Sequence, residues 1–348
     1  MASGPRIVLH VGAPKTASTY IQRRLRMNLE VLRKNKIYVP VLRAVAQMAG
    51  NAKLLPLALG QRPSLTFQRA FPEIDANGLK PTQIVSELLR DWRSDTESIV
   101  LSAENLRPAH AQPLRELLPT SVPCIVVLFL RRQDRWLDSY FNQMIKTNET
   151  HEDISSFLSR LLAGDDARLC RPDWLEHFQA WSDAFGSCSV VFYDEVASDI
   201  FAAFFKAAGL GFVPDLIDID RAQVSLNVYE LAYLLDLKAP HYQEFLQRKT
   251  AGEKASRLLG LKETRSILSD KDLSRLRDAF EESNRRLIKT LDRDENQSPL
   301  QLDVNRSSSS YCSLAEFRVS EAYARFRQSA DAIYARRHRR EYLKSFFK

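Results

Sequence analysis

Residues 6–19, RIVLHVGAPKTAST, join a short apolar run to a glycine-containing turn and then to the start of a helical pattern. The run at residues 6–11 has the composition of a β-strand. From Thr16 onward, apolar side chains recur at spacings of four, four and three residues, at Ile21, Leu25, Leu29 and Leu32. This spacing predicts one amphipathic helix, whose start Thr16 or Ser18 can cap. A strand, a tight turn and a helix open a βαβ unit, so the stretch predicts a parallel sheet.

Further strand-like runs alternate with helical patterns along the chain. Residues 122–130, VPCIVVLFL, form a near-continuous apolar run, which is typical of a central parallel strand covered on both faces. Shorter strand-like runs lie at residues 37–40, 98–102 and 189–193, and helical patterns lie at residues 134–146, 174–185, 200–208, 224–237 and 270–291. The alternation predicts an α/β fold, a mostly parallel central sheet flanked by helices, with a helical C-terminal part.

Length and composition fit a large globular chain. It has 348 residues, of which 45% are hydrophobic and 27% charged, so a large core is expected and disordered or collagen-like classes are not. We expect a main domain at residues 1–300 and, at 301–348, a polar linker followed by a basic helix with Phe326, Ala330 and Ile333 on one face. No run approaches the roughly 18 apolar residues of a membrane span, and no secretory signal pattern is visible, so we expect a cytoplasmic protein without a transmembrane segment.

The cysteine spacing and the charge distribution bear on possible partners. Four widely spaced cysteines without a CxxC pair predict reduced thiols rather than a zinc or redox site: Cys124, Cys170, Cys188 and Cys312. The net charge is +7, and residues 303–348 hold ten Lys/Arg against five Asp/Glu. A basic surface attracts anionic partners such as an acidic glycan, an anionic membrane or a phosphate-rich cofactor. The RRHRR cluster at 336–340 is better explained as a solvated helix end, with its arginines near the C-terminal dipole. It lacks the interleaved aromatics that stack bases, so nucleic acid is not expected.

The turn at residues 12–19, GAPKTAST, has the features of a phosphate site. It joins a strand to a helix, where free backbone N–H groups and the helix dipole favour an anion. Lys15 adds a positive charge, and Thr16, Ser18 and Thr19 add hydroxyl donors. The order differs from the GxxxxGK[ST] of ATP and GTP enzymes. The alternative is that these Thr and Ser residues only cap the helix.

A second candidate anion site follows the strongest strand, in the segment RRQDRWLDSY at residues 131–140. Arg131 falls at the carboxyl end of a central strand, where ligands of open α/β sheets bind, and Ser139 lies eight residues on. Arg offers a planar fork for phosphate oxygens and Ser adds a donor. Arg132 and Arg135 are explained as solvated or ion-paired side chains. Two sites at neighbouring strand ends imply a ligand with two separated phosphates.

Both segments resemble those of sulfotransferases that use 3′-phosphoadenylyl sulfate (PAPS). IVLHVGAPKTASTYIQ is similar to the family's 5′-phosphosulfate-binding loop, and FLRRQDRWLDSYFNQ to its 3′-phosphate-binding segment. The resemblance covers about residues 6 to 300 and implies the P-loop NTPase-like sulfotransferase fold. It assigns the 5′ phosphosulfate to Lys15, Thr16, Ala17, Ser18 and Thr19, and the 3′ phosphate to Arg131 and Ser139. No metal is required.

The chain departs from the family pattern at three positions of the two motifs. Ala17 stands where glycine is common and Ser18 where threonine is common, and Gln133 replaces a common proline. A methyl group at position 17 narrows the approach of the backbone to a phosphate. The basic-glycine segment near the C-terminus of animal cytosolic members has no clear match, and Arg248 and Lys249 are weak substitutes.

Glu104 is the candidate general base. It follows the strand-like run at 98–102, and the family's base sits just before the 3′-phosphate strand, as His in some branches and Glu in others. Tuned carboxylates gather at such strand ends, but Glu104 is also explained as an ion-pair partner of Lys15 or Arg131. His10 is the next candidate base, although its place within a strand favours a packed histidine.

The resemblance implies an activity in which an acceptor hydroxyl or amine attacks sulfur in line. Glu104 would take the acceptor's proton, and Lys15 and the helix N-terminus would stabilise charge on the departing phosphate, leaving the product PAP. A glycan or lipid-linked glycan is one acceptor class, and the basic tail could assist an anionic acceptor or a peripheral membrane contact. Two alternatives stay open: a P-loop phosphotransferase or nucleotide hydrolase, and a non-catalytic basic adaptor.

Overall fold

A computed structural model describes residues 5–42, 44, 50–92, 95–164, 166, 169–219, 225–237, 241–262, 265–302 and 311–346, with side chains up to Arg339. The chain forms two compact units. Unit 1 comprises Met1–Trp136, Gly164–Ala222 and Asp278–Gln301, and unit 2 the remaining segments, Leu137–Ala163, Gln223–Arg277 and Leu302–Lys348. The predicted boundary at residue 300 stays a prediction.

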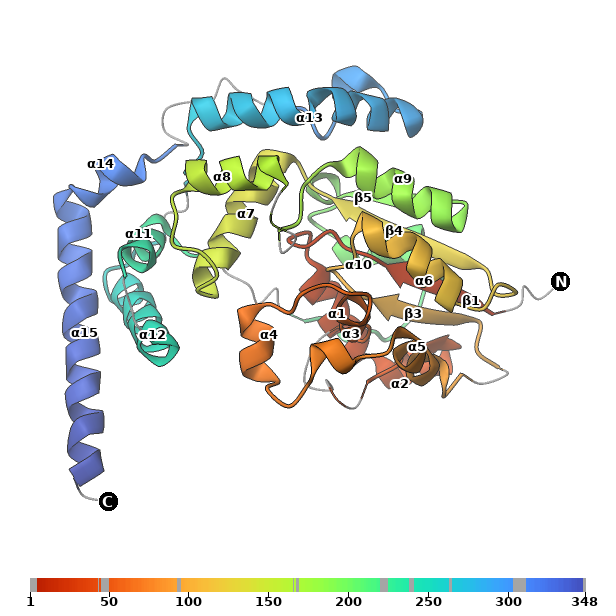
Figure 1. The fold of residues 1–348 in the computed structure, drawn as a ribbon, viewed down its shortest axis with the longest axis horizontal. Coiled ribbons are helices and arrows are strands. Elements are labelled where there is room, and N and C mark those ends of the chain that lie inside the picture. Colours follow the sequence, from red (N-terminus) through yellow and green to blue (C-terminus); the bar gives the residue numbers. More distant parts are fainter. Residues whose placement is uncertain are drawn as a thin grey trace. The chain divides into compact units, whose positions relative to one another are not determined.

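The core of unit 1 is a five-stranded parallel sheet (Figure 1). Its strands are β1 (Arg6–His10), β2 (Ile37–Tyr38), β3 (Ser98–Ser102), β4 (Cys124–Leu130) and β5 (Cys188–Phe192), in the order β2-β3-β1-β4-β5. All four strand pairs are parallel, which confirms the predicted α/β class. The register pairs His10 with both Ser102 and Val127, so the carboxyl ends of β3, β1 and β4 open at one edge of the sheet. Ligands of open parallel sheets bind at this edge.

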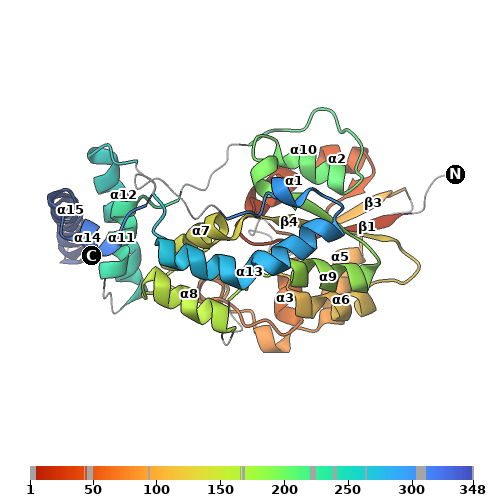
Figure 2. The ribbon, with the colours of Figure 1, turned by 90° about the horizontal axis from the view of Figure 1, so that it is seen from above.

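Helices cover both faces of this sheet (Figure 2). One face packs against α1 (Ser18–Met27), α2 (Leu29–Lys34) and α10 (Ile200–Ala207), and the buried cluster there includes Val8, Ile21, Val127 and Phe204. The other face carries α5 (Pro81–Leu89), α6 (Ala111–Leu117) and α9 (Trp174–Phe185). Among its described residues, the unit also contains α3 (Leu54–Ala58), α4 (Leu65–Ala70) and the 3-10 turns η2 (Ala76–Gly78), η3 (Pro108–His110), η4 (Tyr193–Glu195) and η5 (Glu295–Gln297).

The single helix predicted after Thr16 is two helices, α1 and α2. Asn28 separates them, because its side-chain amide donates to the carbonyls of Arg24, 2.8 Å away, and Ile217, 2.9 Å away. Such side-chain hydrogen bonds compete with the helical pattern. The apolar series still faces the core, since Ile21, Leu25 and Leu32 are buried.

Unit 2 is helical, as predicted for the C-terminal part. It contains α8 (Ile154–Ala163), α11 (Val228–Asp236), α12 (Tyr242–Leu258), α14 (Leu314–Arg318) and α15 (Glu321–Phe346), while α7 (Gln133–Lys146) and α13 (Asp270–Thr290) run through both units. The predicted last helix is α15, which packs on α12 and α11. It buries Tyr323, Phe326 and Ala330, and Ile333 is half-buried. Of the polar linker predicted from residue 301, residues 303–310 lie outside the described residues. Arg336, Arg337 and Arg339 of the basic cluster are exposed.

All four cysteines are free thiols, as predicted. Cys170 and Cys312 are buried, and burial raises the pKa of Cys170 to about 11. None of the described helices combines the length and the low polarity that a bilayer-crossing helix needs. Among the described side chains, no three of the His, Cys, Asp and Glu type are grouped so that they could hold a metal ion.

Candidate functional site

The loop after β1 is held tightly at its base. Beyond the end of the strand, Val11 N donates to the carbonyl of Val127 at 3.1 Å and Ala13 N to that of Phe129 at 2.8 Å. Gly12 has φ +108°, and a Cβ built there would lie 2.4 Å from the carbonyl oxygen of Glu104. Only glycine fits this place, so the loop after β1 lies directly against the segment after β3.

The turn into α1 leaves the helix start without a side-chain cap. Ala17 occupies the N-cap position with φ 63°, and no side chain caps it. The hydroxyl groups of Thr16 and Ser18 donate instead to the carbonyl of Ala13, at 2.5 and 3.2 Å. The predicted cap by Thr16 or Ser18 is therefore wrong, because both hydroxyls are used to close the turn. The first amides of α1 keep their hydrogen-bonding capacity, which an anion can use.

The departure at Ala17 has a conformational consequence. Ala17 has a left-handed backbone conformation, which glycine adopts without strain. An alanine in this conformation destabilises the fold by about 1 kcal/mol relative to glycine. Lys15 shares this conformation, with φ 66°. Two of the three residues 15–17 therefore have a left-handed backbone. The side chains of Lys15, Ala17 and Thr19 are half-buried.

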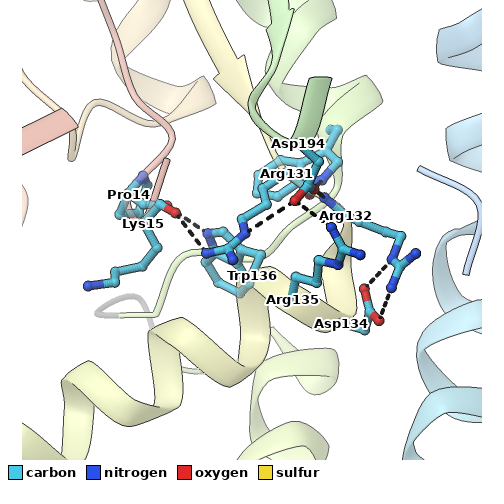
Figure 3. Close-up of polar contacts among 9 residues, drawn as sticks. Pro14, Lys15, Arg131, Arg132, Asp134, Arg135, Trp136 and Asp194 are labelled. Atoms are coloured by element: carbon cyan, nitrogen blue, oxygen red, sulfur yellow. Dashed lines mark hydrogen bonds and ion pairs between the residues drawn. The ribbon is translucent and has the colours of Figure 1, made fainter. Parts of the chain in front are cut away.

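Arg131 lies beside this turn, at the end of β4 (Figure 3). Its carbonyl accepts a hydrogen bond from the indole N–H of Trp174 at 2.8 Å, and its guanidinium lies 4.8 Å from the ring centre of Tyr193. Nη1 makes a long 3.4 Å contact with the carbonyl of Lys15, while Trp136 donates to the carbonyl of Pro14 at 2.8 Å. The structure therefore brings Arg131 and the Lys15 turn together.

The hydrogen-bonding capacity of Arg131 is underused. Its Nε is buried and has no hydrogen-bond partner among the described residues; the nearest carboxylate oxygen, Asp194 Oδ1, is 4.0 Å away. A buried donor without a partner costs free energy, and an anion at this place would supply the missing acceptor.

The neighbouring arginines are ion-paired, as predicted. Arg132 binds both carboxylate oxygens of the buried Asp134, at 2.7 and 2.8 Å. Arg135 lies 2.9 Å from Asp194 Oδ1 (Figure 3). Arg131 thus differs from both, because it has a carboxylate nearby without a hydrogen bond to it.

Two other residues of the second motif lie on α7. Gln133, which replaces the family's proline, is fully buried and exchanges two amide hydrogen bonds with Asn284, at 2.7 and 3.1 Å. The glutamine at position 133 therefore joins α7 to α13 within unit 1 through these hydrogen bonds. Ser139 lies in the part of α7 that belongs to unit 2. Its assignment to the 3′ phosphate stays a prediction.

Glu104 lies just after β3, with Lys53 as its ion-pair partner: Lys53 Nζ is 3.7 Å from Glu104 Oε1. Both side chains are about one-fifth exposed, at 19% and 20%. Neither Lys15 nor Arg131, the partners considered from the sequence, has this contact with Glu104. The sequence did not point to Lys53 as a site residue, because residues 41–96 show no clear pattern of strands and helices.

Asn51 positions the segment that carries Lys53. Strand β2 pairs with β3 only as far as Ile99, which leaves the rest of that edge open. The side chain of Asn51 fills the gap, since it donates to the carbonyl of Val100 at 2.6 Å and accepts from Ser102 N at 2.8 Å. This buried amide takes the place of a missing strand and fixes Lys53 near the carboxyl end of β3.

His10 is a packed histidine, as the sequence favoured. It is fully buried between the rings of Phe129 and Phe204, with centroid distances of 5.7 and 5.5 Å, and its Nδ1 is 2.8 Å from Ser102 Oγ. Burial lowers the pKa of His10 to about 3, which makes it a weak base. Arg248 and Lys249 lie on α12 of unit 2 and pair with Glu244 and Glu253 of the same helix.

No protein-family profile and no curated protein matches the chain. Among solved structures, it is similar to the crystal structure of a sulfotransferase from Alicyclobacillus acidocaldarius, at 14% identity and a TM-score of 0.38, over 63% of this chain and 87% of that one. It is also similar to the sulfotransferase domain from the curacin biosynthetic pathway, at 13% identity and a TM-score of 0.30, over 61% of this chain and 76% of that domain.

Proposed function

We propose that the chain is a sulfotransferase that moves a sulfuryl group from PAPS to a hydroxyl or amine of an acceptor. The observation that carries the proposal is the pairing of two cationic groups at adjacent strand ends. Lys15 lies in the turn after β1, and Arg131 at the end of β4 has a buried Nε without a hydrogen-bond partner among the described residues. A ligand with two separated phosphates fits two such sites.

The residues of the turn would hold the 5′ end of the donor. Lys15, Thr16, Ala17, Ser18 and Thr19 supply a positive charge and the uncapped amides of the α1 N-terminus. Arg131, with Ser139, would hold the 3′ phosphate. PAPS supplies the sulfuryl group when it is bound. The charge of Lys15 and the α1 dipole act on developing negative charge at the 5′ phosphate, which is the kind of electrostatic stabilisation that dominates such transfers.

Glu104 would accept the proton of the acceptor. The close packing of Gly12 against the Glu104 carbonyl puts this residue beside the donor-binding loop. A carboxylate is a poor phosphate ligand, so a role toward the acceptor suits it better than one toward the donor. Lys53, the ion-pair partner of Glu104, would hold this carboxylate in place. An anionic glycan is the acceptor class that the basic tail favours. A cytoplasmic location is part of the proposal.

The experiment is a thermal-unfolding screen with PAP, ATP and GTP, each with and without magnesium. A ligand that binds only the folded chain stabilises it by about 2.7 kcal/mol at one hundred times its Kd. We expect PAP to raise Tm without magnesium and ATP to raise it much less. A larger shift with magnesium and ATP than with PAP would favour a P-loop phosphotransferase instead. Formation of PAP from PAPS in the presence of glycan acceptors then tests the reaction itself.

A further inference from the structure

One carboxylate, Asp194, lies between two arginines at the candidate anion site (Figure 3). It is in the 3-10 turn η4 directly after β5. Its Oδ1 is 2.9 Å from Arg135 Nη1 and 4.0 Å from Arg131 Nε, and its Oδ2 accepts from the backbone N–H of Arg132 at 3.4 Å. The side chain is 18% exposed. Asp194 therefore belongs to the surroundings of Arg131, although no sequence motif points to it.

The two arginines share Asp194 unequally. Arg135 makes a normal hydrogen bond to it, whereas Arg131 stays about 1 Å beyond hydrogen-bonding range. Arg131 is nevertheless held in place from two sides, by the Tyr193 ring under its guanidinium and by Trp174 at its carbonyl. The result is an oriented guanidinium whose counter-ion is bound more closely to another residue.

The local charges define what the site can bind. The Arg132 side chain is neutralised by Asp134, and Glu195, the residue after Asp194, pairs with Arg293. The charges left at the site are those of Arg131, Arg135 and Asp194, which sum to one net positive charge. A phosphate group that approaches Arg131 meets attraction from two guanidinium groups and repulsion from one carboxylate. The repulsion is weakened as long as Asp194 stays hydrogen-bonded to Arg135, because Coulomb repulsion falls with distance from Arg131.

We propose that Asp194 is an internal counter-anion of the Arg131 site, and that an anionic phosphate monoester takes its place as the counter-ion of Arg131 while Asp194 stays hydrogen-bonded to Arg135. Asp194 then lowers the affinity of the site for any single phosphate, so that tight binding requires a ligand anchored at a second point, such as the Lys15 turn. Arg135 is a positioning residue, because it acts on the ligand through Asp194. The identity of the ligand as a nucleotide 3′ phosphate rests on the proposed function, whereas the competition between carboxylate and anion does not.

The test is a double-mutant cycle on phosphate binding. Asp194→Asn keeps the shape and an Oδ1 that can accept the hydrogen bond from Arg135 Nη1, but it removes the charge, so we expect inorganic phosphate and PAP to bind at least about tenfold more tightly. Arg135→Gln frees Asp194 to pair with Arg131, so binding should weaken about tenfold. Arg135→Gln should change the Kd for phosphate much less in the Asp194→Asn background than in the wild type. Glu195→Gln is the control, since it removes one negative charge from the neighbouring residue, and it should leave both affinities within about twofold.

Calorimetric titration of the full chain with PAP and with inorganic phosphate separates the outcomes. Unchanged or weaker binding in Asp194→Asn, or an unchanged Kd in Arg135→Gln, overturns the inference even if PAP binds. If the variants shift phosphate binding as expected and none binds PAP, the inference holds and the proposed function fails. If neither ligand binds any form, both fail. Should Asp194→Asn not fold, Arg135→Gln alone still decides the sign of the effect.

Discussion

Lys53 and Glu104 form an ion pair, 3.7 Å between Nζ and Oε1, that joins the segment anchored by Asn51 to the segment that follows β3. The pair lies next to the loop after β1, because the Glu104 carbonyl packs on Gly12. A general base must be held in place as well as be basic, and an adjacent ammonium group restricts the directions that a carboxylate can take. Lys53 is therefore expected to act on the reaction through Glu104.

Glu104→Gln should lower the rate of PAP formation from PAPS by about 10²–10⁴-fold, because the amide keeps the shape but cannot accept a proton. PAP affinity should stay within about twofold, since Glu104 is not assigned to the donor. Lys53→Met should cause a smaller loss of the same kind. Lys36→Met is the matched control: Lys36 pairs with Glu97 at 2.6 Å, but both side chains are more than half exposed. A Glu104→Gln enzyme with near-normal turnover would remove Glu104 from the mechanism.

Gly12→Ala should destabilise the chain by about 2–4 kcal/mol and abolish most PAP binding, because the new Cβ would overlap the Glu104 carbonyl at 2.4 Å. Gly60→Ala is the control for backbone strain alone. Gly60 also has a positive φ, +93°, but a Cβ there meets nothing within 4 Å. We expect Gly60→Ala to lower the free energy of unfolding by about 1 kcal/mol and to leave PAP binding unchanged. Urea unfolding and calorimetric titration measure the two effects. Equal losses in both variants would show that strain, and not the close approach, makes Gly12 necessary.

The strands of the sheet could be predicted because buried parallel strands are continuous apolar runs, as in β4. Helix α12 could not be predicted in this way, since its buried residues include Ala251, Gly252 and Ala255, which are too small to give a clear hydrophobic periodicity. The break between α1 and α2 also escaped prediction. It depends on a hydrogen bond from Asn28 to Ile217, which is remote in sequence.

The same distinction holds at the site. The Lys15 turn and Arg131 each stand in a local pattern, a strand followed by a turn or helix start, so the sequence alone points to them. Asp194 and Lys53 have no such pattern, and the roles proposed for them rest on contacts with Arg135 and Glu104, which are remote in sequence. The helix cap was mispredicted for a related reason, because the Ala13 carbonyl accepts both hydroxyls that could have capped α1.

Lys15→Ala and Arg131→Ala should damage different steps. Lys15→Ala should lower turnover by about 10²–10³-fold with a smaller effect on PAP affinity, because its charge opposes charge that develops during transfer. Arg131→Ala should weaken PAP binding by about 10–100-fold, the loss expected for charge-assisted hydrogen bonds to a phosphate. Arg293→Ala is the control, since Arg293 also lies over a ring, Phe192, at 4.9 Å but is paired with Glu195. Single-turnover rates and titrations separate the steps, and a shared binding defect with normal turnover would contradict these roles.

Mild acid should destabilise unit 1 through three buried histidines. Burial lowers the pKa of His10 to about 3 and the pKa values of His110 and His177 to about 4, below the value of about 6.5 in an unfolded chain. Between about pH 4 and 6.5 the unfolded chain therefore binds more protons, and the free energy of unfolding falls as the pH drops, by up to about 1.4 kcal/mol per pH unit for each histidine. Urea unfolding followed by the fluorescence of the buried tryptophans measures this slope. His177→Gln should remove the contribution of one buried histidine to this slope. His151→Gln is the control, because it replaces an exposed histidine. A slope that is the same in both variants would mean that carboxylates, rather than these histidines, set the acid sensitivity.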